Sequence, residues 1–481
     1  MIDPEGVGAS PLSPNVESRP GLLRALGPGM ATAIVVGNVI GSGIFAKPGQ
    51  VALEGGSFGL IITAWISAGL LCLMGALCYA ELAVMLPRAG GAYVYLGHAY
   101  GRPVGFLYGW NDFLFGRPAS IGALSSFFAY QLGKVLGWNL EFAGEVLLPL
   151  AVIVLLAGVN IAGVIWGGRM QGATTILKMA LLALIALLPV ICYELGTGGV
   201  DPANLGTQLS KPATGGFAVM LLSIMWAYDG WEGVTPVAEE IREPQRNIPI
   251  ALFAGLGTVM VLYVSANVAY HTVLSMDEVA ASQNVAVDVM KRLLGSHGET
   301  LMAAGMMVSA FGAINSNMLL GPRVSFAMGR DDVFFRQLGR VHVNFRTPVT
   351  AIVVQALMSS ALILSAAILV RTVPALYKTS IFDLLTNYFV FSASIFYVLN
   401  VLAIFVLRRR HPEWARPYRT LGYPVVPVIY LLFYGWFMSQ IYVARPYEAN
   451  IGIALIALGL PVYWGWRAWA IRNPPNLRDG E

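Results

Sequence analysis

Charged side chains are scarce in this sequence. They make up 12% of the 481 residues, whereas 57% of the residues are hydrophobic. Soluble domains carry about 25% charged residues, so this composition excludes a large soluble domain and predicts an all-α integral membrane protein. The formal net charge of +4 gives no reason to expect nucleic acid as a partner, because the basic residues follow the membrane topology described below.

Cysteine and histidine are also rare, with three cysteines and five histidines. The cysteines lie in or beside apolar stretches, where they pack as small hydrophobic residues, and their spacing fits no disulfide framework or metal site. The histidines fall at predicted loops or span ends and share no metal-binding spacing. We therefore expect no metal site and no cofactor. A membrane enzyme is disfavoured too, because it needs a cluster of catalytic side chains.

Twelve apolar stretches are long enough to cross a hydrocarbon core of about 30 Å. They lie near 29–53, 57–86, 103–133, 145–166, 170–193, 214–241, 248–274, 299–328, 348–370, 379–408, 424–444 and 450–471. An even number of spans places both termini on the same side of the membrane. Residues 1–28 are expected to form a disordered tail without a signal peptide, and residues 473–481 a short C-terminal tail.

The basic residues predict the orientation of these spans. With both termini in the cytoplasm, twenty of the 30 Lys and Arg residues fall on the cytoplasmic side and eight outside, and Arg117 and Lys178 remain within spans. Cytoplasmic loops carry an excess of basic residues. We therefore expect a multi-pass protein of the plasma membrane with both termini in the cytoplasm.

Two short segments interrupt spans 1 and 6: VGNVIGSGIF (36–45) and WAYDGW (226–231). Two glycines close together in the first disfavour a continuous helix, and Asp229-Gly230 puts a carboxylate and a helix breaker at bilayer depth. Non-helical backbone is tolerated there only where it is buried in protein or lines a cavity. Such paired breaks are typical of transporters built from inverted repeats. We expect a 5+5 inverted repeat (about 29–194 and 214–410) as a transporter core over 29–410, followed by two additional spans in 411–472.

The breaks also predict a ligand. If the helix of span 1 restarts near Ile44, its first amides lack intrahelical partners, and its positive dipole end suits a carboxylate. The first half of span 6 ends near Ala227 with unpaired carbonyls and a negative dipole end, which suits an ammonium group. A carboxylate and an amine on one carbon describe a free amino acid.

Other interpretations stay open for the individual residues. Gly37 and Gly41 form a GxxxG motif, which in many membrane proteins serves only helix packing. A nucleotide-binding turn would need a preceding strand, which the flanking span excludes. Asp229 is either a structural partner of backbone amides or a contact for the substrate amine or a proton. Trp226 and Trp231 are either core aromatics or part of the site.

Further motifs carry a resemblance to a known family. They are Pro48 after the first break, Arg117-Pro118-Ala119-Ser120 in span 3, Lys178 in span 5, WAYDGWEGVTPVAEEIREPQRNIPIAL (226–252) and FGAINSNMLLGPRVSFAMGRDDVFF (311–335). With the two breaks, and in this order, they resemble the amino acid–polyamine–organocation (APC) superfamily. The most similar branch is that of the L-type amino acid transporters, and the resemblance is strong over about residues 25–410.

The resemblance implies twelve helices that work by alternating access. It assigns the substrate carboxylate to the backbone of the GSG segment and the amine to carbonyls of both breaks. The substrate-binding residues predicted in this way are Ile40, Gly41, Ser42, Gly43, Trp226, Ala227 and Asp229. Trp226, whose position is commonly Phe, and one face of span 3 (Ser120, Ile121 and Leu124) are expected to bound the substrate side chain.

The sequence departs from the animal members of this branch at two places. The position of Asp229 is commonly Gly or Ser there, so the charge preference of the site stays open. Animal members also carry a cysteine in the external loop after span 3, which forms a disulfide with a heavy chain. The corresponding loop, 132–145, has none. No disulfide-linked heavy chain is therefore expected, as in a stand-alone prokaryotic carrier.

Lys178 has no acidic residue near it in the sequence of span 5. A cation within a span is costly unless it finds acceptors or a cavity. The unwound part of span 1 frees carbonyls, so we expect the ammonium group to brace that segment and to do the work of the sodium ion in sodium-coupled relatives of the fold. The alternative is that the side chain snorkels to the cytoplasmic interface.

We therefore predict a secondary active transporter of small to medium neutral L-amino acids that works by sodium-independent exchange. H⁺-coupled symport and transport of cationic amino acids or polyamines remain alternatives. A non-transporting amino acid sensor is disfavoured, because such sensors usually have long regulatory termini. The predicted partners are the free amino acid and the lipid bilayer.

Overall fold

The computed structural model describes residues 21–138, 142–209, 216–372, 389–444 and 446–472. Within these ranges the regular elements are helices, and β pairing is confined to two isolated bridges. The all-α prediction is confirmed. Parts of three predicted segments lie outside the described part of the chain. They are residues 1–20 of the N-terminal tail, residues 379–388 of span 10 and the C-terminal tail, 473–481.

Ten of the twelve predicted spans are helices, or pairs of helices, that are long and apolar enough to cross a membrane within the described residues. They are α1 (Pro28–Val39) with α2 (Gly43–Ala46), α4 (Phe58–Met85), α8 (Phe142–Ile161), α9 (Val164–Glu194), α11 (Pro244–Val273), α14 (Ser296–Arg330), α15 (Val349–Thr372), α17 (Phe389–Arg410), α18 (Val425–Ala444), and α19 (Pro446–Ala457) with α20 (Gly459–Arg472). The protein is therefore a multi-pass membrane protein.

The other two predicted spans are interrupted helices. Span 3 consists of α6 (Arg102–Asn111), the π-helical turn η1 (Asp112–Gly116) and α7 (Arg117–Leu136). Span 6 consists of α10 (Gly216–Tyr228), a non-helical turn and the 3₁₀ helix η3 (Thr235–Glu240). A π-helical turn inside an α-helix often marks a functional site.

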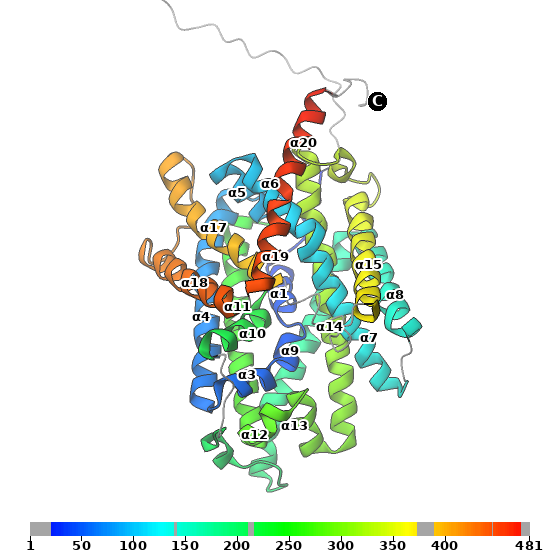
Figure 1. Ribbon diagram of the computed structural model, residues 1–481, viewed down its shortest axis with the longest axis vertical. Helices are drawn as coiled ribbons and strands as arrows, with labels where there is room; N and C mark the ends of the chain where they lie inside the picture. The colour runs from blue at the N-terminus through cyan, green and yellow to red at the C-terminus, as the bar shows by residue number, and fades with distance from the viewer. Residues whose placement is uncertain (1–20, 139–141, 210–215, 373–388, 445, 473–481) are drawn as a thin grey trace, which may run out of the picture.

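Short helices cover the two ends of the bundle. They are α3 (Pro48–Gly55), α5 (Ala92–Tyr100), η2 (Pro202–Gly206), α12 (Met276–Ala281), α13 (Val285–Leu294) and η4 (Arg336–Gly339). Figure 1 shows α5 and the end of α20 at the top of the molecule and α12 and α13 at the opposite end. The predicted orientation places the top on the cytoplasmic side.

Both predicted helix breaks are confirmed. The first helix ends at Val39 and restarts at Gly43, and α10 ends at Tyr228. Gly230 then adopts a φ of +88°, a left-handed conformation that glycine tolerates best. The breaks lie against each other, since a Cβ atom added to Gly43 would lie 2.5 Å from the Cα atom of Ala227.

Two predicted boundaries are wrong. The disordered tail does not extend to residue 28, because the buried Leu26 donates its amide to the carbonyl of Glu240 (3.0 Å) and accepts from the amide of Arg242 (2.9 Å). These backbone bonds hold the segment before α1 against the link between η3 and α11. Span 4 ends at Ile161 rather than 166, because the chain turns at Gly163, whose φ is +146°. The division into two inverted repeats stays a prediction.

Candidate functional site

A cavity lies where the two helix breaks meet α7 and α17. It measures about 70 Å³, counted as the space that the centre of a water molecule can reach. The residues of its walls include Asn38, Val39, Gly41, Ser42, Gly43, Trp226, Asp229 and Gly230 from the breaks, Asp112, Arg117, Ser120 and Leu124 from η1 and α7, and Phe396 and Tyr397 from α17. Residues that are far apart in the sequence therefore share one cavity.

The restarted helix presents unused amides at this cavity. The first backbone hydrogen bonds of α2 come from the amides of Phe45 and Ala46, which both donate to the carbonyl of Ser42. The amides of Ser42, Gly43 and Ile44 have no protein acceptor among the described residues. The hydroxyl of Ser42 is also buried without a protein partner in the described part of the chain. These donors, at the positive end of a helix, are suited to an anion such as a carboxylate.

Two side chains join the breaks to each other. The amide nitrogen of the Asn38 side chain donates to the carbonyl of Gly230 at 2.7 Å. The hydroxyl of Tyr263, on α11, lies 3.0 Å from the carbonyl oxygens of both Val39 and Ala227. Carbonyls in the last turns of α1 and α10 are thus held together by a single buried phenol.

Lys178 contacts the first break from the side of α9. Its Nζ atom donates to the carbonyl oxygens of Gly37 at 2.7 Å and Ile40 at 2.6 Å. Ser309, on α14, donates to the carbonyls of Ile40 and Gly41 at 3.2 and 3.1 Å. The lysine side chain is buried and does not snorkel to an interface, so that alternative is wrong.

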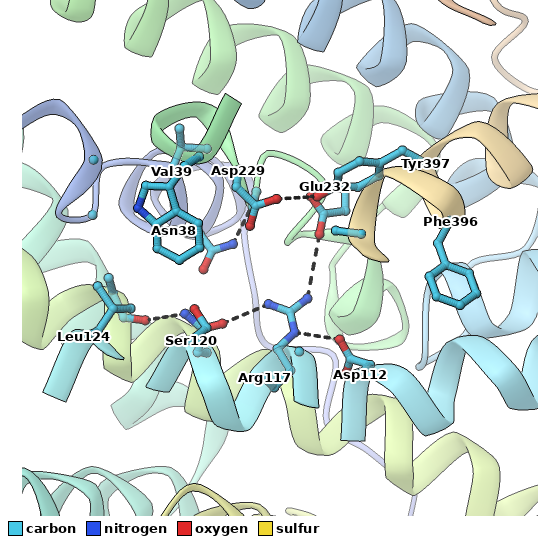
Figure 2. A pocket seen from close by; sticks show the side chains of 18 of the residues that line it. Asn38, Val39, Asp112, Arg117, Ser120, Leu124, Asp229, Glu232, Phe396 and Tyr397 are labelled. Carbon is cyan, nitrogen blue, oxygen red and sulfur yellow. Dashed lines mark hydrogen bonds and ion pairs between the residues drawn. The ribbon is translucent and has the colours of Figure 1, made fainter. Parts of the chain in front are cut away.

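A buried guanidinium group links three structural elements at the edge of the cavity (Figure 2). Arg117, at the start of α7, donates to Asp112 of η1 at 3.1 Å and to Asn317 of α14 at 3.0 Å. It also lies 3.8 Å from Glu232, in the turn after α10. Bonds of this kind fix the relative positions of η1, α14 and the second break.

A tyrosine connects two carboxyl groups on the facing wall. The hydroxyl of Tyr397, on α17, lies 2.8 Å from Asp229 and 3.2 Å from Glu232. Together with Asp112, the cavity wall holds three carboxyl groups and one guanidinium group, that of Arg117. The excess of carboxyl groups favours a ligand that brings a positive charge.

Comparison with known proteins identifies the family. The family model of amino acid permeases matches residues 26–461. The chain belongs to the amino acid permease family.

Curated relatives of this permease cover nearly the whole chain. The serine/threonine exchanger SteT of Bacillus subtilis (strain 168) is 31% identical over 451 residues, which are 93% of this chain and 98% of the relative. The large neutral amino acids transporter small subunit 2 of Homo sapiens is 33% identical over 465 residues, 95% of this chain and 84% of the relative. The Asc-type amino acid transporter 1 of Mus musculus is 32% identical over 463 residues, which are 95% of this chain and 83% of the relative. The resemblance to the L-type branch is confirmed.

Most of the predicted substrate-binding residues of the permease lie at the cavity. Gly41, Ser42, Gly43, Trp226 and Asp229 line it, as do Ser120 and Leu124 of span 3. Ile40 and Ala227 are not part of the lining. Their carbonyls accept hydrogen bonds from Lys178 and Ser309, and from Tyr263, respectively.

The expectation for Ile121 is wrong. Its side chain is fully buried in an apolar cluster with residues of α8 and α14, and it is not part of the cavity lining. Ser120, one position before Ile121, and Leu124, three positions after it, both line the cavity.

Several residues of the site were not predicted. Arg117 had a sequence signal, because a charge within a span is unusual, and Glu232 lies within a recognised motif. Asn38, Tyr263 and Tyr397 had no such signal. Buried tyrosine and asparagine are common in packed helices, and their partners are backbone or side-chain groups 36 to 224 positions away in the sequence.

Proposed function

We propose that this permease exchanges small neutral L-amino acids across the plasma membrane by alternating access, without sodium. The observation that carries the proposal is the position of the two helix breaks. They line one cavity that has free amides on one wall and an excess of carboxyl groups on another. A zwitterion is the ligand that matches both walls.

The carboxylate of the amino acid binds at the start of α2. The amides of Ser42 and Gly43 donate to its oxygens, with the hydroxyl of Ser42 as a further donor. The helix dipole adds a favourable positive end there. The ammonium group lies toward the second break, where Asp229 lines the cavity and Glu232 adds a second carboxyl group.

The size of the cavity supports a small side chain. The centre of a water molecule can reach about 70 Å³ of it, which is a small space for an amino acid. SteT, which is named as a serine/threonine exchanger, fits the same size class. The large side chains of Trp226 and Leu124 line the cavity and leave little space for a larger substrate side chain.

Sodium independence follows from the place of Lys178. Its ammonium group already occupies the carbonyls of the unwound segment, where a coupling cation would otherwise bind. The excess of basic residues on one side supports both termini in the cytoplasm. The three cysteines are buried and unpaired, which supports a carrier that needs no disulfide-linked heavy chain.

Cationic amino acids are the second candidate substrate. Three carboxyl groups against one guanidinium group leave room for a second positive charge, on the substrate side chain. The small volume of the cavity disfavours lysine and arginine, because their long side chains would need space beyond it.

Exchange in proteoliposomes tests the proposal. Vesicles loaded with unlabelled L-serine, in sodium-free buffer, are expected to take up labelled L-alanine, and vesicles without internal amino acid to take up little. A panel of twenty external competitors then ranks the substrates. Uptake that needs sodium, or that lysine and arginine inhibit far better than serine and alanine, would overturn the assignment. Uptake driven by a proton gradient into empty vesicles would replace exchange by symport.

A further inference from the structure

A second cleft lies at the end of the molecule where α20 leaves the helical bundle. It measures about 490 Å³ and is formed by the start of α6, the segment after α14 and the face of α20 that carries Tyr463, Trp466 and Arg467. Arg102 and Arg467 lie on opposite elements of this cleft. Figure 1 shows α6 and α20 side by side at this end. The cleft shares no residue with the amino acid cavity.

The two arginines of the cleft are not neutralised within the protein. Both are exposed, and neither has a carboxylate partner among the described residues. The carboxylate in the cleft, Asp332, is paired with Arg336 at 2.6 Å. The helix α6 also begins at Arg102, so its positive dipole end lies at the cleft. The cleft therefore favours an anion.

An adjoining cleft of about 300 Å³ shares Arg102. Its carboxylate, Asp331, is also occupied, because it pairs with Arg88 at 3.4 Å and accepts a hydrogen bond from Tyr93 at 3.1 Å. The positive charge of Arg102 is thus left unbalanced on both sides.

The aromatic side chains of α20 place the cleft at a membrane interface. Trp464 and Trp469 are 53% and 55% exposed, and the guanidinium of Arg467 lies 5.5 Å from the ring centre of Trp464. Trp466 packs against Phe335, with the ring centres 4.7 Å apart. Exposed tryptophans at the end of a span lie at the level of the lipid headgroups. A soluble anion would make no favourable contact with this exposed apolar surface.

We propose that this cleft binds the headgroup of an anionic phospholipid of the cytoplasmic leaflet. Arg102 and Arg467 contact the phosphate oxygens, and the acyl chains lie along Trp464 and Trp469. Basic pockets between helices on the cytoplasmic side are suited to such headgroups. The proposal rests on the orientation given above and is independent of the substrate. The lipid would hold the start of α6, which continues through η1 into the α7 wall of the amino acid cavity.

Native mass spectrometry of the purified full-length protein tests this site. Titration with phosphatidylglycerol and with phosphatidylcholine compares the wild type with the double variant Arg102→Gln/Arg467→Gln. We expect tighter binding of phosphatidylglycerol to the wild type. The double variant should bind it roughly 25-fold more weakly, at about fivefold for each arginine near an anionic lipid. The variant Arg102→Lys/Arg467→Lys should retain most of the binding.

A matched control removes two other exposed arginines from the same side of the protein. In Arg169→Gln/Arg409→Gln, Arg169 lies 5.5 Å over the ring of Trp166, as Arg467 does over Trp464, and lipid binding should not change. Equal losses in both double variants, or no loss in the first, would overturn the proposal. Displacement of the lipid by millimolar inorganic phosphate would indicate a site for a soluble anion instead. The single variant Arg467→Gln, which loses only a ring contact, repeats the test if the double variant does not fold.

Discussion

The Nζ atom of Lys178 lies 2.6 Å from the carbonyl oxygen of Ile40, the C-cap residue that follows α1. A second bond joins the same Nζ atom to Gly37, one turn earlier. A helix end leaves carbonyls without partners and carries a negative dipole. A buried ammonium group donates hydrogen bonds to these carbonyls and interacts favourably with the negative dipole end. We expect it to stabilise the break in the conformation that leaves the amides of α2 accessible from the cavity.

Replacing the ammonium group should abolish transport. In Lys178→Met, the buried carbonyl of Gly37 loses its charged donor, and the carbonyl of Ile40 is left with the hydroxyl of Ser309. An unsatisfied buried group costs about 1–3 kcal/mol. We expect exchange in proteoliposomes to fall at least about tenfold, since about 1.4 kcal/mol changes a population tenfold, and sodium should not restore it. Lys134→Met serves as the control, because among the described residues the ammonium group of Lys134 contacts the ring of Tyr130 and no carbonyl of a helix break. Normal exchange by Lys178→Met would refute the bracing role.

A methyl group at Gly43 should push the two breaks apart. The added Cβ atom would lie 2.5 Å from the Cα atom of Ala227, and backbone cannot move aside as a flexible side chain can. Gly43→Ala is expected to lose amino acid binding, measured by titration of the purified protein. Gly29→Ala, in α1, has no atom within 4 Å of the added group and should bind normally. Equal affinities in the two variants would show that close contact of the breaks is not required.

Loss of the Tyr263 hydroxyl, which joins α1 and α10, should reduce stability and exchange more than loss of the Tyr270 hydroxyl. Tyr263→Phe removes a buried hydroxyl that lies 3.0 Å from two carbonyls, and we expect a loss of about 1–3 kcal/mol of stability together with slower exchange. Tyr270→Phe, on the same helix, removes a single bond of 3.4 Å and should have a smaller effect. Thermal unfolding and initial exchange rates distinguish the two. A larger effect at Tyr270 would contradict this account.

An ion pair between the short helices α12 and α13 should make part of the stability depend on pH. Hydrogen bonds from Arg292 and from the amide of Ser275 lower the pKa of Glu278 to about 2. Because the pKa is lower in the folded state than the usual value of about 4.3, the stabilisation is present above pH 4.3 and is lost as the pH falls toward 2. The pair is exposed, so the effect is at most about 1 kcal/mol.

The measurement for this pair is thermal unfolding of Glu278→Gln and wild type over a series of pH values. The difference in melting temperature should be largest near neutral pH and should shrink between about pH 4 and pH 2. Asp277→Asn removes an adjacent carboxylate that makes no ion pair in the described structure, and it should show no such trend. A difference that grows as the pH falls would have the wrong sign.

Local sequence signals were sufficient to predict the helix breaks. The GSG segment and Asp229-Gly230 weaken a helix by their own backbone preferences, wherever the rest of the chain lies. Lys178 was predictable for a similar reason: a buried cation must find acceptors, and the break is the place in the bundle where carbonyls are free. The fold class followed from the length and composition of the spans.

The remaining contacts of the site depend on how the helices pack. Whether Ile121 or Leu124 lines the cavity is decided by the rotation of α7 about its axis, which the sequence of this helix alone does not specify. The partners of Tyr263 and Tyr397 come from other helices, and any of several buried tyrosines could have made those contacts. The carbonyls of Ile40 and Ala227 were expected to bind the substrate. In the structure they accept hydrogen bonds from side chains of α9, α11 and α14 instead.

The central claim is that the two breaks recognise the amine and the carboxylate of one small amino acid. Calorimetric titration of the purified protein with L-alanine, with ethylamine, which lacks the carboxylate, and with propionate, which lacks the amine, tests it most directly. Each lost group removes charge-assisted hydrogen bonds worth about 1.5–3 kcal/mol. We therefore predict that both analogues bind at least about tenfold more weakly than L-alanine. Binding of either analogue as tightly as L-alanine would contradict the account.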